Sequence, residues 1–237
     1  MKAIYQKELK SYFYTPTGWL FIAVFLAIAS LVFYLNNLLP RGSDLMQFLS
    51  MMSYVWMLLS PILVMRLLAG ERRQATDNLL MSAPLRVNSL VIGKFLAACT
   101  VMLLAVALSL LYPILLSFYA KVYPMEVLTG YLGFLLQGCA FIALGMMVTS
   151  NLKNAVTAAA VAFGVNLFLW LASLLTNSAS IPQAITKPLS FLSLYERFVP
   201  FLTAQLSVAN VLFYMMFCVS MLAVTVLVMS HARNKTR

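Results

Sequence analysis

Six long apolar stretches constrain the fold of this chain more than any other feature of its sequence. They lie at residues 17–38, 46–68, 88–119, 127–149, 154–176 and 207–230. Each is close to the ~20 residues with which a helix crosses a ~30 Å hydrocarbon core. Only 9% of the 237 residues are charged, whereas soluble domains carry about 25%. The pattern predicts an all-α membrane protein with six transmembrane helices, and we interpret residues 1–237 as a single domain.

The positive charges are distributed unevenly between the segments that join these stretches. The net charge of +10 would by itself also fit a nucleic-acid-binding protein. If the amino terminus is inside, twelve of the 16 Lys and Arg residues lie in cytoplasmic segments and four lie outside. Such an excess sets the orientation of multi-pass proteins. We therefore expect a bacterial inner (cytoplasmic) membrane protein with both termini cytoplasmic and with no nucleic acid partner.

The first 14 residues have an amphipathic pattern. One helical face carries Ile4, Tyr5, Leu9, Tyr12 and Phe13. This predicts an elbow helix on the cytoplasmic leaflet, and Pro16 and Gly18 would end it before the chain turns into the membrane. The apolar stretch that follows is too long for the core of a cleavable signal peptide, so we expect it to remain as a signal anchor.

Prolines interrupt two later regions. Pro113 lies within the long third stretch; we expect a kink there, with the Ser109 side chain bonding the carbonyl that Pro113 frees. Segment 177–206 is half apolar and contains three prolines, too interrupted to span the membrane. It is predicted to form short re-entrant or interfacial helices at the outer face before the sixth transmembrane helix. A plain loop that caps the bundle is the alternative.

Residues that carry catalytic or coupling chemistry are scarce. The single histidine, His231, lies in the terminal tail, and no acidic residue lies in the middle of an apolar stretch. Proton- or sodium-coupled carriers usually need such groups, and the chain has no GxxxxGK[ST] phosphate-binding loop. The three cysteines form no CxxC pair. The sequence therefore predicts no catalytic residues, no metal and no cofactor bound by this chain.

A few polar or aromatic side chains inside the stretches are candidates for a cavity or a helix interface. The candidate set is Ser30, Tyr34, Ser60, Gln137 and Asn166. Gln137 and Asn166 are the strongest candidates for a lining role. Ordinary interhelical hydrogen bonds, worth about 0.6–2 kcal/mol each, are the alternative interpretation. Close packing of the fourth helix is expected at Gly130, Gly133, Gly138 and Gly145.

Residues 69–84, AGERRQATDNLLMSAP, form a charged island between the second and third stretches. Its polar and apolar members are Glu71, Arg72, Arg73, Gln74, Thr76, Asp77, Leu79 and Leu80. A short helix that presents both kinds of surface can fill a groove on a soluble partner, with the charges setting its register. We predict a docking helix on the cytoplasmic side. A solvated loop is the alternative.

Four segments have the order and spacing of one permease family. They are KELKSYFYTPTGWLFIAVF, LAGERRQATDNLLMSAP, GMMVTSNLKNAVTAA and YERFVPFLTAQLSVANVLFY. Together they resemble the ABC-2 (type V exporter) permeases, in particular the gliding-motility-type and nitrous-oxide-reductase-maturation-type transmembrane subunits. The second segment resembles the family's coupling helix, which docks on the nucleotide-binding subunit. Asp77 stands where Glu is commoner, and the short first outer loop argues against a large extracellular domain.

The resemblance implies the transmembrane permease subunit of an ATP-driven ABC exporter. The island would couple this chain to a cytosolic ABC ATPase subunit, which binds the ATP and Mg. A second permease copy, or a homologous permease, would complete a cavity at the dimer interface, lined mainly by helices one, two and five. Some relatives also work with a membrane-anchored accessory subunit. The chain itself would be non-catalytic.

Two other classes of function are weighed against this one. A secondary carrier or channel would need buried charges or an inverted repeat, and neither is evident. A membrane anchor for a cytosolic ATPase, without substrate translocation, fits the same residues. Substrate-stimulated ATPase activity of the complex would discriminate between anchor and exporter, and the sequence does not identify the substrate.

Overall fold

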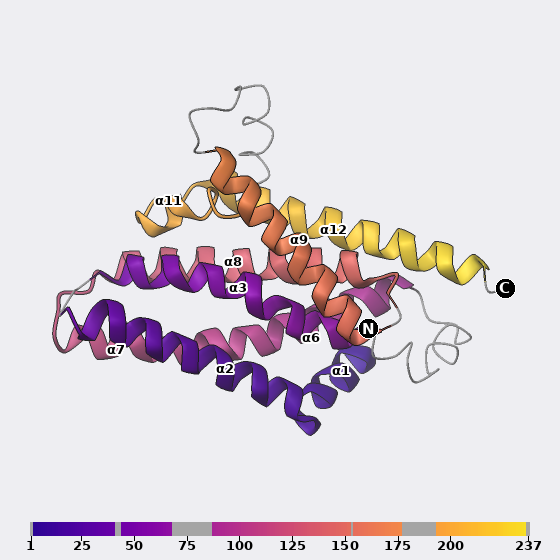
Figure 1. Ribbon diagram of the computed structural model, residues 1–237, viewed down its shortest axis with the longest axis horizontal. Helices are drawn as coiled ribbons and strands as arrows, with labels where there is room; N and C mark the ends of the chain where they lie inside the picture. The colour runs from indigo at the N-terminus through magenta and orange to yellow at the C-terminus, as the bar shows by residue number, and fades with distance from the viewer. Residues whose placement is uncertain (1, 41–43, 68–86, 153, 177–192, 236–237) are drawn as a thin grey trace.

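The computed structural model describes residues 2–40, 44–67, 87–152, 154–176 and 193–235 of the chain (Figure 1). Every regular element within these ranges is helical, which confirms the predicted all-α class. The elements in chain order are α1 (Lys2–Tyr14), α2 (Pro16–Phe33) with a π-helical turn η1 (Tyr34–Leu38), α3 (Leu45–Leu67), α6 (Val87–Ser109), α7 (Leu111–Ser117), α8 (Pro124–Thr149), α9 (Ala155–Thr176), α11 (Val199–Leu202) and α12 (Val208–Lys235).

Five helical segments in the described ranges are long and apolar enough to cross a membrane. They are Pro16–Leu38, Leu45–Met65, Val87–Ser117, Pro124–Thr149 and Val208–His231. Their ends lie within about three residues of five of the predicted stretches, since a run of apolar side chains ends where a helix leaves lipid. The remaining predicted stretch corresponds to α9, whose apolar part Ala155–Leu171 is shorter than the others. A sixth transmembrane helix therefore stays a prediction.

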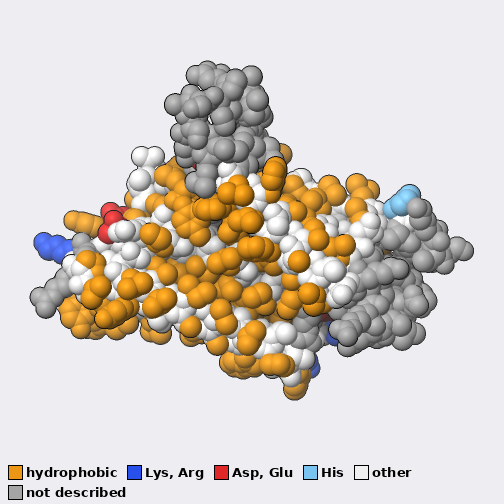
Figure 2. All heavy atoms as spheres, viewed as in Figure 1, with side chains coloured by type: hydrophobic (Ala, Val, Ile, Leu, Met, Phe, Trp, Pro, Cys, Tyr) orange, Lys and Arg blue, Asp and Glu red, His pale blue; other side chains and the backbone are white. Residues whose placement is uncertain are grey.

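The long helices lie side by side in one elongated bundle (Figure 1). Helix α8 is central and contacts α3, α6, α9 and α12. Helix α9 crosses the bundle obliquely and packs on α3 and α8. Hydrophobic side chains cover most of the face seen in Figure 2, and the charged side chains in that view lie toward its ends. A surface of this kind is suited to contact with lipid, because hydrocarbon cannot solvate polar groups.

Glycines allow the close approach of neighbours to α8. A Cβ atom on Gly133 would lie 2.6 Å from the Cβ of Phe201, and one on Gly138 would lie 2.5 Å from the Sδ of Met102. Gly130 and Gly145 face Leu49 and Val64, with corresponding distances of 2.7 and 3.0 Å. The close packing predicted for this helix is therefore present at all four glycines.

Aromatic rings fill the centre of the bundle between α2, α3 and α8. Trp56 is fully buried. Its ring centroid lies 5.3 Å from that of Phe25 and 4.9 Å from that of Phe134. Rings of this size dominate the packing of a core, so Trp56 is a packing residue of α3.

The predicted amino-terminal helix is present as α1, and it packs against α6 and α2. The Tyr12 hydroxyl donates to the Leu63 carbonyl of α3 at 2.7 Å. The chain turns at Thr15, and Pro16 is in the first turn of α2, where its missing N–H is not needed. A Cβ atom on Gly18 would lie 2.7 Å from the Tyr12 carbonyl oxygen. A location on the membrane surface stays a prediction for α1.

The helix breaks near Pro113 as expected, but the expected hydrogen bond at the break is wrong. Helix α6 ends at Ser109 and α7 begins at Leu111. Pro113 cannot donate to the carbonyl of Ser109, four residues earlier; the hydroxyl of Tyr131 donates to it instead, at 2.9 Å. The Ser109 hydroxyl bonds the Val106 carbonyl in its own turn, at 2.7 Å, as serine commonly does within helices.

Most of the predicted outer segment 177–206 cannot be compared with the structure, because residues 177–192 lie outside the described ranges. The described part contains turns and the four-residue helix α11. Phe198 and Phe201 are fully buried against the bundle. Re-entrant helices stay a prediction here.

Candidate functional site

One face of α3 carries a row of polar side chains. Ser50, Ser53, Tyr54 and Ser60 recur at helical spacing, so they lie along one side of the helix. Ser53 and Ser60 are only 2% and 1% exposed. The row therefore faces the inside of the bundle, where polar groups need partners.

Ser50, Ser53 and Tyr54 in this row contact two neighbouring elements. The Ser53 hydroxyl donates to Oε1 of Gln137 on α8 at 2.8 Å. The hydroxyls of Ser50 and Tyr195 lie 2.9 Å apart. The rings of Tyr54 and Tyr195 stack with their centroids 5.1 Å apart. The row thus links α3 to α8 and to the described segment that follows residue 192.

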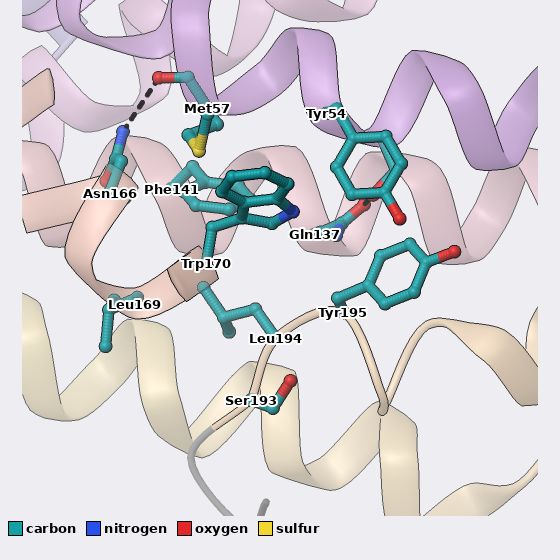
Figure 3. Close-up of a pocket in the computed structure, with 11 residues that line it drawn as sticks. Tyr54, Met57, Gln137, Phe141, Asn166, Leu169, Trp170, Ser193, Leu194 and Tyr195 are labelled. Carbon is teal, nitrogen blue, oxygen red and sulfur yellow. Dashed lines mark hydrogen bonds between the residues drawn. The ribbon is translucent and has the colours of Figure 1, made fainter. Parts of the chain in front are cut away.

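Pro61 leaves one main-chain carbonyl of α3 without its helical hydrogen bond. Because proline has no N–H, the carbonyl of Met57, four residues earlier, lacks its helical partner. The Nδ2 atom of Asn166 on α9 donates to that carbonyl at 3.1 Å (Figure 3) and to the Ser60 hydroxyl at 3.1 Å. Asn166 is 1% exposed. One buried amide of α9 therefore supplies the hydrogen bond that α3 lacks.

A cavity of about 30 Å³ lies where these groups meet. Gln137, Asn166, Trp170 and Tyr195 are among its lining residues, and they come from α8, α9 and the segment after residue 192 (Figure 3). No donor in the described residues reaches Oδ1 of Asn166, so a hydrogen-bond acceptor is available there. The volume suits a water molecule; pockets for drug-sized ligands occupy about 300–1,000 Å³.

The structure brings together three of the five candidate cavity residues. Ser60, Gln137 and Asn166 belong to the polar network around α3. Ser30 lies elsewhere, with its hydroxyl 2.8 Å from that of Tyr112. Tyr34 is 51% exposed in the π-helical turn after α2. The latter two residues do not join the network within this chain.

Sequence reasoning missed several members of this network. Ser53, Tyr54, Trp170 and Tyr195 are not among the cavity candidates that the sequence suggests. The helical spacing of the α3 polar residues is a usable signal. So is Pro61, because a proline inside a membrane helix requires a donor from elsewhere.

A second polar cluster joins α1, α3 and α6. Lys94 of α6 is fully buried, and its Nζ atom lies 3.7 Å from Oε1 of Glu8 on α1. Lys94 also donates to the carbonyl of Leu67. Glu8 is 8% exposed and lies 3.7 Å from Nζ of Lys7. The cluster, which we call the elbow junction (Glu8, Leu67 and Lys94), connects three helices through one buried ammonium group.

The elbow junction lies close to the described residues that flank the charged island in the chain. Leu67 is the last residue of α3, and α6 begins at Val87. All the predicted coupling residues fall between them, outside the described ranges: Glu71, Arg72, Arg73, Gln74, Thr76, Asp77, Leu79 and Leu80. Helix α1 also approaches α6 closely nearby, since a Cβ atom on Gly93 would lie 3.0 Å from Cγ2 of Ile4.

Within the described part of the chain, no group of three or more His, Cys, Asp or Glu side chains is placed to hold a metal ion. The Sγ atoms of Cys99 and Cys139 lie 3.7 Å apart, and both residues are free thiols. A disulfide requires about 2.05 Å between its sulfur atoms.

Comparison with known proteins places these features in one family. The family model described as ABC-2 family transporter protein matches residues 2–233. The match includes the elbow junction, the α3 network and residues 69–84. A comparison with curated proteins finds no match. The gliding-motility-type or nitrous-oxide-reductase-maturation-type assignment stays a prediction.

Proposed function

This chain belongs to the ABC-2 transporter family, and we propose that it is the transmembrane permease subunit of an ATP-driven ABC exporter. Separate cytosolic ABC ATPase subunits would supply the energy and would bind the ATP and Mg. The protein would lie in the bacterial inner membrane with both termini in the cytoplasm, as the distribution of Lys and Arg favours. The elbow junction and residues 69–84 would then face the ATPase.

The observation that carries the coupling part of this proposal is the burial of Lys94. A buried ammonium group is costly unless it is paired and hydrogen-bonded. Lys94 meets both conditions, through Glu8 of α1 and the last carbonyl of α3. The junction therefore ties the beginning of α6 to the end of α3 and to α1. A force applied to the island between α3 and α6 would be passed to three helices together.

The charged island would provide the contact with the ATPase. Glu71, Arg72, Arg73 and Asp77 would set the register of docking, and Leu79 and Leu80 would enter an apolar groove of the partner. The remaining polar members, Gln74 and Thr76, would complete this surface. ATP binding would close the two ATPase subunits and move each island.

The α3 network offers a place where this movement could act on substrate. On helix α9, the buried side chains form a narrow row that faces the bundle: Ala158, Ala162 and Asn166. Its opposite side is open, with Val156 and Phe168 72% and 68% exposed. A second permease copy, or a homologous permease, would cover α2, α3 and α9 and would form the substrate cavity with them at the dimer interface. Changing the populations of two conformational states from 1:99 to 99:1 takes about 5.5 kcal/mol. ATP binding to the partner would supply this free energy.

Purification from native membranes in a mild detergent tests the proposal. We expect a cytosolic ATPase with a GxxxxGK[ST] loop to co-purify with this chain, in a complex that contains two permeases and hydrolyses ATP. An additional membrane-anchored protein in the complex would identify an accessory subunit. A chain that purifies alone, as a monomer and without ATP hydrolysis, would contradict the proposal.

A further inference from the structure

The side of α1 that faces away from the bundle carries a row of exposed side chains. The row consists of Lys2, Gln6, Lys10 and Tyr14. They recur at every fourth position and so lie along one side of the helix. The buried residues of α1, which include Ile4 and Tyr12, lie on the opposite side. Two cations therefore share the exposed side of this helix.

This arrangement differs from that of a helix that lies on a membrane with its apolar side in lipid. Interfacial helices bind through buried apolar area and through electrostatic attraction to anionic lipids. In α1 the apolar side is occupied by contacts with α2, α3 and α6. Positive charge is then the main feature of the side that remains, and an anionic surface complements it.

Helix α1 lies at one edge of the membrane-length helices. It ends at Tyr14, and the candidate span of α2 begins at Pro16. Figure 1 shows the two helices meeting at a sharp turn. Tyr12 also bonds the carbonyl of Leu63, near the end of the candidate span Leu45–Met65. Helix α1 therefore lies at the level where these helices leave the hydrocarbon core, which is the level of the lipid headgroups.

Exposed aromatic rings mark the same level. Tyr14 is 86% exposed, and Trp19, near the start of α2, is 61% exposed. The Nε1 atom of Trp19 donates to the carbonyl of Phe13 at 3.1 Å, which holds the indole at the corner between the two helices. Tyr and Trp are enriched where hydrocarbon meets water. Because Tyr14 belongs to the exposed row, this side of α1 faces the membrane interface.

We propose that the lysine side of α1 (Lys2, Gln6 and Lys10) binds the phosphate groups of anionic phospholipids. Lysine carries a compact charge on a flexible apolar stem, so its ammonium group reaches the phosphates while the stem stays on apolar surface. An acidic protein surface is the other class of partner, and it would keep this side of α1 out of contact with lipid. The inference does not depend on the exporter proposal.

Fluorescence quenching by brominated lipids tests this site on the full-length protein in vesicles. Gln6→Trp places a reporter one turn from each lysine, and its signal is taken as the difference from the unsubstituted protein. Vesicles contain either brominated phosphatidylglycerol in phosphatidylcholine or brominated phosphatidylcholine in phosphatidylglycerol. Each lysine near an anionic surface favours binding about fivefold, so we expect phosphatidylglycerol to be preferred by about 25-fold. At 1 M salt the Debye length falls to about 3 Å, and the preference should weaken.

Matched variants in the Gln6→Trp background show whether the two lysines cause the preference. Lys10→Gln should reduce it to about fivefold, and Lys2→Gln combined with Lys10→Gln should abolish it. Arginine at both positions should retain it. Lys121→Gln removes an exposed cation between α7 and α8 and should leave it unchanged. Equal quenching by both lipids, or a preference that survives the double glutamine variant, would overturn the proposal. Quenching by neither lipid would also overturn it and would assign this side of α1 to a soluble partner.

Discussion

Asn166 of α9 donates a hydrogen bond to the main-chain carbonyl of Met57 on α3, at 3.1 Å. Pro61 leaves that carbonyl without its helical partner. The same arrangement occurs at Pro113, where the hydroxyl of Tyr131 takes the place of the missing N–H. At both prolines, a side chain from a neighbouring helix satisfies the interrupted backbone. Because water is not available in hydrocarbon, such donors tie helices together.

This relationship predicts a coupling between Asn166 and Pro61. Asn166→Ala strands a buried carbonyl and should lower the free energy of unfolding by about 1–3 kcal/mol. In a Pro61→Ala background, the N–H of residue 61 can donate to the Met57 carbonyl. The same substitution should then cost less, with a coupling energy of about 0.5–3 kcal/mol. Thermal unfolding of the four proteins in detergent measures the cycle.

Val161→Ala serves as the control for this cycle, because Val161 lies on the same helix and is 44% exposed. Its effect should be small in both backgrounds. Strict additivity of Asn166→Ala and Pro61→Ala would mean that Asn166 does not replace the missing backbone donor.

Substitution by alanine should have opposite effects on stability at two glycines. A Cβ atom on Gly138 would lie 2.5 Å from Sδ of Met102 and 3.1 Å from Cε2 of Trp56. Gly138→Ala should therefore destabilise the bundle by about 1–3 kcal/mol through overpacking. A Cβ atom on Gly164 of α9 would have no neighbouring atom within 4 Å, and Gly164→Ala should stabilise by about 0.5–1 kcal/mol through helix propensity. An unfolding temperature that Gly138→Ala leaves unchanged or raises would contradict the described packing of α8.

The helices can be predicted from the sequence because their signal is local. The first stretch is predicted at 17–38 and lies at Pro16–Leu38, since apolar content alone marks where a chain enters and leaves lipid. The rotation of each helix cannot be predicted in the same way. The apolar residues of helix α6 are spread evenly around its axis, so its pattern does not tell which side meets α1 and which meets α8.

The candidate site is only partly predictable for the same reason. Gln137 and Asn166 are recognisable as unusual polar groups in apolar stretches, and both are buried in the α3 network. Their partners lie 84 and 109 residues away in the sequence, and single-sequence patterns carry no information on such pairs. From the sequence, Lys94 is expected only to flank the third stretch. Its burial depends on Glu8, which lies four residues from both Ile4 and Tyr12 and so on the apolar face of residues 1–14, a signal that sequence reasoning did not use.

The elbow junction predicts that removing one charge of its ion pair lowers stability much more than removing both charges. Lys94→Ala removes the buried partner of the Glu8 carboxylate and should lower the free energy of unfolding by about 3–5 kcal/mol. Combining Lys94→Met with Glu8→Gln removes both charges and should recover most of that loss. Lys10→Met, on the exposed side of α1, is the matched control and should have little effect. A double variant as unstable as Lys94→Ala would show that the pair does not hold the junction.

The coupling role proposed for residues 69–84 is tested by ATP turnover of the purified complex carrying Glu71→Ala and Arg72→Ala together. Truncating one member of a buried interfacial ion pair costs about 2–5 kcal/mol. We expect that the ATPase no longer co-purifies, or that it hydrolyses ATP without transport, while insertion into the membrane stays normal. ATPase binding, ATP turnover and transport at the level of the unsubstituted complex would show that residues 69–84 are a solvated loop and would contradict the proposed coupling.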